Sequence, residues 1–410
     1  MAALFIVVAD TVVAGEEEQW EQVVDQVASA VLSIRVDATR AFDTEWNSST
    51  QATGFIVDAE KGIVLTNRHV VQPGPVIATG GFLNREEVEL RPIYRDPVHD
   101  FGFYQYDPKA LSFNNPAQLT LKPGLVQIGK EIRVIGNDGG EQLSILVGTI
   151  ARLDREAPRY GRGGYNDFNT YYIQAASGIS GGSSGSPVVD INGNVIALGA
   201  GASRKNAASF FLPLDRVARA LKYVREGQPV PRGTLQTTFL HQPFDELRRL
   251  GLSLASEAAA REGFPQGVGL LIVSQVIPGS PAEGVLQPGD VLLRVEDEMI
   301  FSFIQLDRIW DSHVGGEITL QLERGGQPLE VTLPVQDLHA ITPDSYIEFG
   351  DAVVHNLSYQ QARNYNVPVS GVYVAIPGYV LGNEAISRGT VITALNNTPT
   401  QTLDAFEAIL

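Results

Sequence analysis

The sequence predicts a mainly β protein with more than one domain. Its 410 residues exceed the roughly 150 that one domain usually holds. From Val31 to about Ala200 the chain consists of short β-branched runs separated by Gly, Asn and Asp, which is typical of an all-β barrel or sandwich. A Gly/Pro cluster at residues 226–233 interrupts this pattern and indicates a domain boundary. Beyond it, strand and helix patterns alternate, so we expect smaller α+β units there.

Composition excludes several classes of function. Apolar residues make up 44% of the chain and charged residues 19%, a globular profile. The net charge of −17 argues against nucleic acid and anionic membranes as partners. The absence of Cys excludes disulfide scaffolds, cysteine nucleophiles and Cys-type zinc sites. No apolar run reaches the roughly 18 to 20 residues that cross a bilayer, so we expect a soluble protein without membrane insertion.

The first elements follow from periodicity. Apolar residues spaced by three and four from Trp20 to Val31 predict a helix, and the acidic residues 16–18 suit its N-terminal end. Residues 4–9 are apolar but lack the basic flank of a secretory signal, although residues 12–15 resemble a cleavage site, so a signal peptide stays an alternative. The clearest strand candidates that follow are residues 54–57, 63–65, 132–135 and 188–189.

The later elements form two similar series. Asp215 to Arg225 is helical by spacing. The first series has a strand at 270–276, turns at 278–281 and 287–290, a helix at 304–312 and two strands around Gly325 and Gly326. A second, weaker series starts near Ile341, with a strand at 371–376, a turn into a strand at 388–392 and a helix at 403–410. This second series lacks the last two strands, so we expect a fragment of a longer protein.

Two segments supply a base and an orienting carboxylate. A strand ends in a polar turn at residues 65–71 (LTNRHVV), which presents His69, and histidine suits proton transfer near neutral pH. Asp100 precedes an apolar run and is expected beneath His69, where it fixes the imidazole tautomer. Asp96 is the weaker candidate because it precedes Pro97 and has the pattern of a turn residue.

A third segment, residues 181–187 (GGSSGSP), supplies the nucleophile. The Gly-rich bend exposes Ser184 and lets the backbone N–H groups of Gly182, Ser183 and Ser184 converge as an oxyanion hole. Ser180, Ser183 and Ser186 are the alternatives for the nucleophile. Ser184 is favoured because Gly stands two residues before it and one after, a pattern that Ser183 and Ser186 lack.

The order of these residues discriminates between enzyme folds. A hairpin pattern follows Ser184, with a β-branched pair at 188–189 and a turn at 192–193, whereas the α/β-hydrolase elbow requires a helix there. The order His69, Asp100, Ser184 is that of chymotrypsin. The other five histidines have no such context, and no metal-spaced cluster is present, so neither metal nor cofactor is expected.

These motifs resemble the HtrA/Deg family of trypsin-like serine proteases with PDZ domains. The resemblance rests on residues 66–71 (TNRHVV), 100–103 (DFGF), 135–137 (IGN), 182–187 (GSSGSP), 279–283 (GSPAE) and 286–291 (LQPGDV). The variants NRHVV, DPVHDFG and GGSSGSPV are most similar to the fungal nuclear branch called Nma111. The resemblance implies a chymotrypsin-like double β-barrel protease domain at 16–228, a first PDZ domain at 233–336 and a second, truncated PDZ-like domain at 341–410.

Two positions depart from the family pattern. Ser186 stands where the family has Gly, which places a side chain beside the active site. Gln236, in the segment 234–237, replaces the Gly that lets backbone amides approach a peptide carboxylate. This replacement argues against capture of peptide C-termini, while addition of a peptide strand near helix 304–312 stays open.

The resemblance also implies a substrate pocket and a reaction. Gly178, six residues before Ser184, carries no charge, which implies an apolar P1 side chain; Ile179 and Phe210 are candidate pocket walls. The function expected is that of a serine endopeptidase that cleaves unfolded or partner proteins through an acyl-enzyme. The alternative is a catalytically silent holdase chaperone or PDZ scaffold.

Assembly and location follow from the resemblance alone. It implies a homotrimer and the nucleus, with mitochondrion or periplasm as alternatives. The chain has no Lys/Arg cluster of the localisation type, so an import signal is expected outside these residues.

Overall fold

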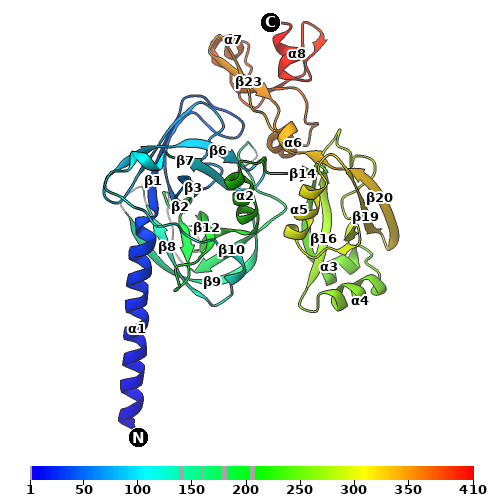
Figure 1. The fold of residues 1–410 in the computed structure, drawn as a ribbon. Coiled ribbons are helices and arrows are strands. Elements are labelled where there is room, and N and C mark those ends of the chain that lie inside the picture. The colour runs from blue at the N-terminus through cyan, green and yellow to red at the C-terminus, as the bar shows by residue number, and fades with distance from the viewer. Residues whose placement is uncertain (1, 138–142, 159–160, 162, 177–181, 204–207) are drawn as a thin grey trace. The chain divides into compact units, whose positions relative to one another are not determined.

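The computed structural model confirms a mainly β fold. It describes residues 2–410 except 138–142, 159–160, 162, 177–181 and 204–207 (Figure 1). The chain divides into two compact units: residues 1–39, 47–158 and 171–228 form the first, and residues 40–46, 159–170 and 229–410 form the second. No helix in the described part of the chain is long and apolar enough to span a bilayer.

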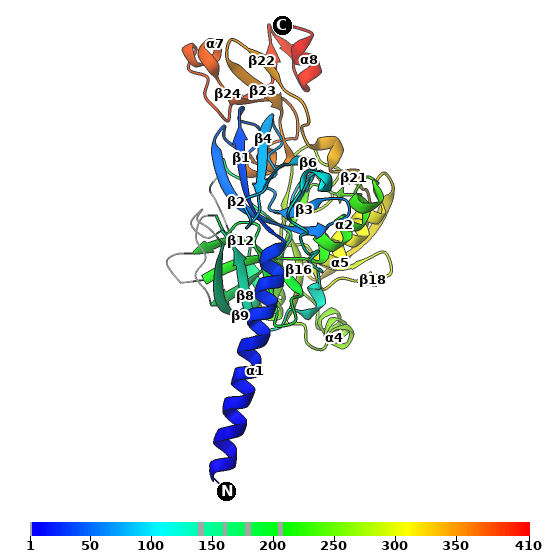
Figure 2. The ribbon, with the colours of Figure 1, turned by 60° about the vertical axis from the view of Figure 1, so that its left-hand side comes forward.

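The first unit begins with α1 (Ala2–Ser29), which leads directly into β1 (Val31–Ala38). The predicted apolar spacing is confirmed, because Trp20, Val23 and Val27 are buried. The guanidinium of Arg133 lies 4.1 Å from the centre of the Trp20 ring. This contact holds the C-terminal half of α1 against β8 (Glu131–Gly136). Figure 2 shows the ribbons of α1 and β8 side by side.

A seven-stranded antiparallel sheet forms the first half of this unit, in the order β5-β4-β1-β2-β3-β7-β6. Its further strands are β2 (Ser49–Asp58), β3 (Ile63–Thr66), β4 (Val76–Gly81), β5 (Glu87–Glu89), β6 (Arg91–Arg95) and β7 (Gly102–Gln105). β3 and β7 are neighbours, with Thr66 opposite Gly102. The residues that follow Thr66 and those that precede Gly102 therefore leave the sheet at the same edge.

A closed barrel forms the second half, in the order β10-β13-β12-β11-β8-β9. Its other strands are β9 (Ser144–Glu156), β10 (Tyr171–Ala176), β11 (Pro187–Val189), β12 (Val195–Ser203) and β13 (Ala208–Pro213). Fully buried side chains from these strands, among them Ile132, Val188 and Phe211, fill its interior. Two 3₁₀ turns precede it, η1 (Pro108–Ala110) and η2 (Pro123–Leu125), and α2 (Asp215–Glu226) follows it and ends at Gly227 in the left-handed conformation.

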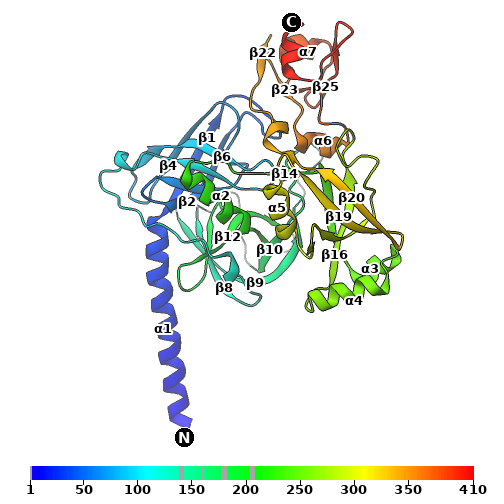
Figure 3. The same ribbon diagram turned by 45° about the vertical axis from the view of Figure 1, so that its right-hand side comes forward.

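The second unit contains two sheets with helices packed on them. The first sheet runs β15-β16-β17-β19-β20, with β18 paired to β17, and a separate pair is made by β14 and β21 (Figure 3). Its elements are β14 (Gly233–Thr234), β15 (Thr237–Pro243), α3 (Phe244–Arg249), α4 (Leu254–Gly263), β16 (Gly269–Val276), β17 (Val291–Val295), β18 (Glu298–Met299), α5 (Phe303–Ser312), β19 (Glu317–Arg324), β20 (Gln327–Pro334) and β21 (Gln336–Asp337). The predicted strand at 270–276 and helix at 304–312 are confirmed.

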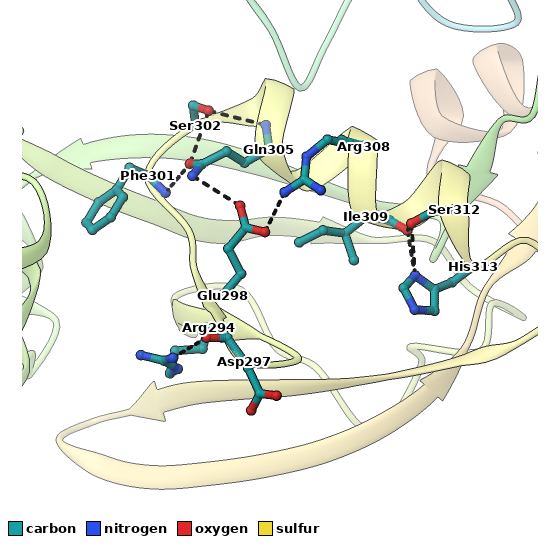
Figure 4. A network of polar contacts seen from close by, with 10 residues as sticks. All are labelled: Arg294, Asp297, Glu298, Phe301, Ser302, Gln305, Arg308, Ile309, Ser312 and His313. Atoms are coloured by element: carbon teal, nitrogen blue, oxygen red, sulfur yellow. Dashed lines mark hydrogen bonds and ion pairs between the residues drawn. The ribbon is translucent and has the colours of Figure 1, made fainter.

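A polar network ties α5 to the β17–β18 hairpin (Figure 4). Ser302 caps the helix by accepting a hydrogen bond from the N–H of Gln305, at 3.3 Å. The Gln305 amide donates to Glu298 at 3.4 Å, and Arg308 forms an ion pair with the same carboxylate. The helix is therefore attached to the sheet by side chains as well as by its apolar face.

The second sheet of this unit runs β22-β23-β24-β25. The elements from here to the end are η4 (His339–Ile341), β22 (Ile347–Phe349), β23 (Ala352–Asn356), α6 (Tyr359–Tyr365), β24 (Val372–Ile376), α7 (Gly378–Asn383), β25 (Val391–Ile392), β26 (Ala394–Leu395), β27 (Thr398–Pro399) and α8 (Leu403–Glu407). Val354, Leu357 and Val372 are buried in its core.

Residues 40–46, which connect β1 to β2, are grouped with this second unit. Ala41 is fully buried among apolar side chains of β23, β24 and α6. The Phe42 ring stacks on the imidazole of His355 at 4.4 Å, and Arg388 donates hydrogen bonds to the carbonyls of Asp43 and Glu45. Sequence periodicity does not reveal that residues 40–46 belong to the second unit, because their contacts join positions more than 300 residues apart.

His355 is the polar centre of this contact. Its Nε2 accepts the N–H of Asp43 at 2.9 Å, and its Nδ1 lies 2.7 Å from the carbonyl of Asn356. A carbonyl can only accept, so Nδ1 carries the proton and the ring is neutral. Burial lowers the pKa of His355 below its ordinary value.

We expect acid to destabilise this unit through His355. The folded state keeps the ring neutral, whereas the unfolded chain takes up a proton below about pH 6.5, so the stability that depends on a neutral ring is present above that pH and is lost as pH falls. Urea unfolding and hydrogen exchange of residues 40–46 between about pH 5.5 and 7.5 measure this loss. His355→Gln should flatten the pH dependence, whereas His313→Gln, the same change directly after α5, should not. Equal profiles for both variants would contradict the assignment.

Candidate active site

The antiparallel pairing of β3 and β7 brings His69 and Asp100 together. Nδ1 of His69 lies 2.9 Å from Oδ1 and 3.0 Å from Oδ2 of Asp100, and the His69 N–H also donates to Oδ1 at 3.2 Å. The Asp100 side chain is buried, while the His69 side chain keeps 32% of its surface exposed. A buried carboxylate on Nδ1 directs Nε2 outward as the proton acceptor, which is the arrangement of a general base.

Thr53 on β2 connects this pair to the nucleophile loop. Its N–H donates to the carbonyl of Ser184 at 2.8 Å, and its hydroxyl donates to the carbonyl of Gly182 at 2.8 Å. Its own carbonyl accepts the hydroxyl of Thr66, at the end of the strand that leads to His69, at 2.7 Å. One residue of the first sheet therefore fixes the backbone of the Ser184 loop and the strand that carries His69.

Exposure separates the three serines of this loop. Ser183 and Ser186 are 1% and 0% exposed, whereas Ser184 is partly exposed. Gly185 has a φ of +84°, and a Cβ there would lie 2.0 Å from the carbonyl oxygen of Thr53. The loop thus requires Gly beside Ser184, as the sequence pattern indicates.

The departure at Ser186 is accommodated by Gly136 at the end of β8. A Cβ on Gly136 would lie 1.9 Å from the Ser186 hydroxyl oxygen and 2.9 Å from its Cβ. The Ser186 hydroxyl has no hydrogen-bond partner among the described residues. Ser186 therefore fills a space that a residue without a side chain, 50 positions earlier, leaves open.

The predicted oxyanion hole and pocket are described only in part. Gly182, with a φ of +98°, and Ser183 lie in the described loop, whereas Gly178 and Ile179 fall outside the described residues. Phe210 lies on β13 and is 7% exposed, with the guanidinium of Arg155 5.4 Å from its ring centre. Arg155, an exposed residue of β9, therefore places a positive charge near the Phe210 ring. The sequence does not indicate this contact.

A groove of about 600 Å³ lies over the first sheet. Asn137 lines it, and the N–H of Asn137 donates to the Thr53 hydroxyl at 2.9 Å. From there the groove runs over the outward faces of β1, β2, β4 and β5, lined by polar side chains that include Arg35, Gln51 and Glu87. Among the described residues, its lining includes neither His69 nor Ser184.

In the segment 234–237, the backbone of Gln236 is hydrogen-bonded within the protein. Gln236 has a φ of +51°, the left-handed region that favours the Gly it replaces. Its N–H is taken by the hydroxyl of Thr234 at 2.8 Å, and its carbonyl accepts the N–H of Ile277. The Gln236 N–H is therefore already used within the segment, and the absence of C-terminal capture stays a prediction.

The free edge of β15 is covered in part by Asn169. Its side-chain amide donates to the carbonyl of Thr237 at 3.2 Å and accepts the N–H of Phe239 at 2.7 Å. Arg363 on α6 holds the same segment, because it donates to the carbonyl of Asn166 at 2.7 Å and lies over the Phe168 ring. A peptide strand adding to β15 would have to displace Asn169.

Thr53, Asn137 and Gly136 are functional positions that sequence reasoning missed. Asn137 and Gly136 belong to the IGN motif quoted from the sequence, so a signal was available for them. Thr53 carries none, because its role depends on contacts with residues about 130 positions away. In the described part of the chain, no group of three or more His, Asp or Glu side chains could hold a metal ion.

Comparison with known proteins agrees with this architecture. A trypsin-like peptidase domain matches residues 52–198, a PDZ domain matches residues 272–324 and a PDZ-like domain matches residues 340–410. The chain is 51% identical over 404 residues to Protease Do-like 7 of Arabidopsis thaliana and 50% identical over 396 residues to the pro-apoptotic serine protease nma111 of Aspergillus oryzae. Each match covers 96% of this chain but only 37% and 38% of those proteins.

Solved structures establish the fold. The HtrA-type protease AlgW with a tripeptide matches with a TM-score of 0.56 at 22% identity, over 78% of this chain and 97% of that one. A serine endoprotease from Yersinia pestis matches with a TM-score of 0.51 at 20% identity, over 78% of this chain and 97% of that one.

Gly136→Ala should destabilise the chain by about 1–3 kcal/mol, because the new methyl group overlaps Ser186. Adding Ser186→Gly removes the overlapping atoms and should restore most of the loss. Urea unfolding of the two single variants and the double variant measures this coupling. Gly124→Ala, the same change where nothing lies within 4 Å of the new Cβ, is the control; additive effects at Gly136 and Ser186 would contradict the account.

Proposed function

The chain combines a trypsin-like peptidase domain with two PDZ domains, the arrangement of the HtrA/Deg serine proteases, and we propose that it is a serine endopeptidase. The observation that carries the proposal is the hydrogen-bonded pair of His69 and Asp100. Thr53 connects the strand that leads to His69 with the loop that carries Ser184. His69, Asp100 and Ser184 are the three side chains that acyl transfer requires, in chymotrypsin order. The chain spans less than two-fifths of the relatives it matches, so activity is proposed for this segment.

In this mechanism, Nε2 of His69 removes the proton of the Ser184 hydroxyl as Oγ attacks the scissile carbonyl. Asp100 holds Nδ1 protonated and stabilises the imidazolium that forms. The N–H groups at the Gly-rich loop, Gly182 and Ser184 among them, stabilise the oxyanion. His69 then gives its proton to the leaving amine, and water hydrolyses the acyl-enzyme by the same route. No metal or cofactor enters this chemistry.

Proteins or peptides are the substrate class. This class follows from the combination of a peptidase domain with PDZ domains. An apolar P1 residue is proposed from the uncharged Gly178 and rests on the family resemblance.

A catalytically silent holdase or PDZ scaffold is the competing function. The same fold can lose turnover through collapse of the loops around the nucleophile while the three side chains stay in place. The two functions differ in one observable, the reaction of Ser184 with an electrophile.

Ser184→Ala should abolish labelling by a fluorophosphonate probe and cleavage of unfolded casein, while thermal unfolding stays near that of the unchanged chain. The reason is that Ser184 is partly exposed, so its hydroxyl can be removed without leaving a core cavity. Ser183→Ala, in the same loop, should still be labelled. Labelling that depends on Ser183 and not on Ser184 would refute the nucleophile, and an unchanged chain that binds casein without labelling or cleavage would favour the holdase.

The nucleus and a homotrimer are proposed from similarity to the Nma111 branch, with no role for nucleic acid. The net charge of −17 supports the last point. We expect a fluorescent fusion of the full-length protein to be nuclear and the purified protein to sediment as a trimer. A fusion confined to mitochondria, or a monomer at micromolar concentration, would refute the respective proposal.

A further inference from the structure

Asp96 is a second buried aspartate beside Asp100, and its side chain builds the turn that carries Asp100. It is 0% exposed. Its Oδ1 accepts the backbone N–H groups of Val98 and His99 at 2.9 and 2.7 Å, and its Oδ2 accepts the Tyr94 hydroxyl at 2.9 Å. A buried carboxylate is stable only where donors compensate for lost water, and these donors fix the backbone just before Asp100.

Backbone hydrogen bonds close the same turn from the other side. The N–H of Asp96 donates to the carbonyl of Phe101 at 3.1 Å, and the N–H of Phe101 donates to the carbonyl of His99 at 2.8 Å. Asp100 lies between these anchored positions, 2% exposed, with its carboxylate on His69. The direction of the Asp100 side chain therefore follows from the turn.

The turn is also attached to the backbone that precedes His69. Arg68 is 1% exposed, and its Nε donates to the carbonyl of Asp96 at 2.9 Å. The Asn67 amide donates to the carbonyl of Asp100 at 2.9 Å. The side chains of Asn67 and Arg68, which directly precede His69, therefore bind the backbone carbonyls of the two aspartates. These bonds set the distance between His69 and Asp100.

We propose that Asp96 is a positioning residue for the hydrolytic reaction, acting through the turn 96–101 and Arg68 to hold His69 against Asp100. This inference rests on the proposed function. Asp96 does not touch the reacting atoms, because its carboxylate faces Val98, His99 and Tyr94. Its effect is geometric, and a displacement of about 1 Å at a reacting group can cost on the order of 100-fold in rate.

The decisive variants are Asp96→Ala and Asp96→Asn in the full chain, assayed on one peptide with an apolar P1 residue. Asp96→Ala removes both acceptors and should lower kcat about 100-fold with KM nearly unchanged. Asp96→Asn keeps an oxygen for Val98 and His99 and should recover most of the rate. Asp100→Asn is the reference for loss of the carboxylate itself, which costs about 10⁴-fold in well-studied triads.

The pH profile separates positioning from loss of fold. When Asp100 is displaced it stabilises the imidazolium less, so the midpoint of the rise in kcat/KM with pH should move down in Asp96→Ala. Asp190→Ala is the matched control, because Asp190 is also buried and its Oδ1 also accepts two backbone N–H groups, from Asn192 and Asn194. This variant should lower the melting temperature. It should leave the midpoint of the pH profile unchanged when rates are normalised to the labelled active sites.

The failure of this inference can be distinguished from failure of the proposed function. Titration of the His69 imidazole by NMR in the Ser184→Ala chain needs no turnover, and Asp96→Ala should lower its pKa there while Asp96→Asn should not. If Asp96→Ala does not fold, Tyr94→Phe, which removes only the bond to Oδ2, should shift the pKa in the same direction by less. An unchanged His69 pKa in Asp96→Ala, or an Asp96→Asn variant as impaired as Asp96→Ala, would overturn the positioning role. A wild-type chain that the fluorophosphonate probe does not label would overturn only the proposed protease activity.

Discussion

The site depends on the hydrogen bonds of Thr53. This fully buried residue accepts from Thr66 and Asn137 and donates to the carbonyls of Gly182 and Ser184. A buried amide, carbonyl or hydroxyl left without a partner costs about 1–3 kcal/mol, so these bonds leave the two halves of the first unit few alternative registers. The strand that leads to His69 and the loop that carries Ser184 are positioned through this one residue.

The same logic extends to the residues around it. Close packing leaves almost no spare volume, so the side chain at Ser186 is possible only because Gly136 has none. On the other side of the site, buried aspartates and their donors fix the turn around Asp100. The nucleophile loop and the acid–base pair are therefore each held by a rigid shell, while His69 itself stays one-third exposed for a substrate.

The second unit contains segments that the chain order assigns to the first. Residues 40–46 complete the buried cluster of β23, β24 and α6, and residues 163–170 bind α6 and the edge of β15. Both segments connect strands of the first unit, so their contacts link the folding of the C-terminal unit to loops of the N-terminal one. The buried, neutral His355 makes part of this linkage sensitive to acid.

Sequence alone determined what depends on local chemistry and order. It shows the strand periodicity and the Gly/Pro boundary. It also shows the order of His69, Asp100 and Ser184 and the replacement of Gly by Gln236. Tertiary structure decided what depends on partners far along the chain. Thr53 carries no local signal of its role, and the IGN motif does not show that Gly136 makes room for Ser186. Asp96 has the pattern of a turn residue, and residues 40–46 have that of an ordinary loop. Hydrogen-bond pairing and close packing join positions that are tens to hundreds of residues apart, and a linear pattern does not encode which of them meet.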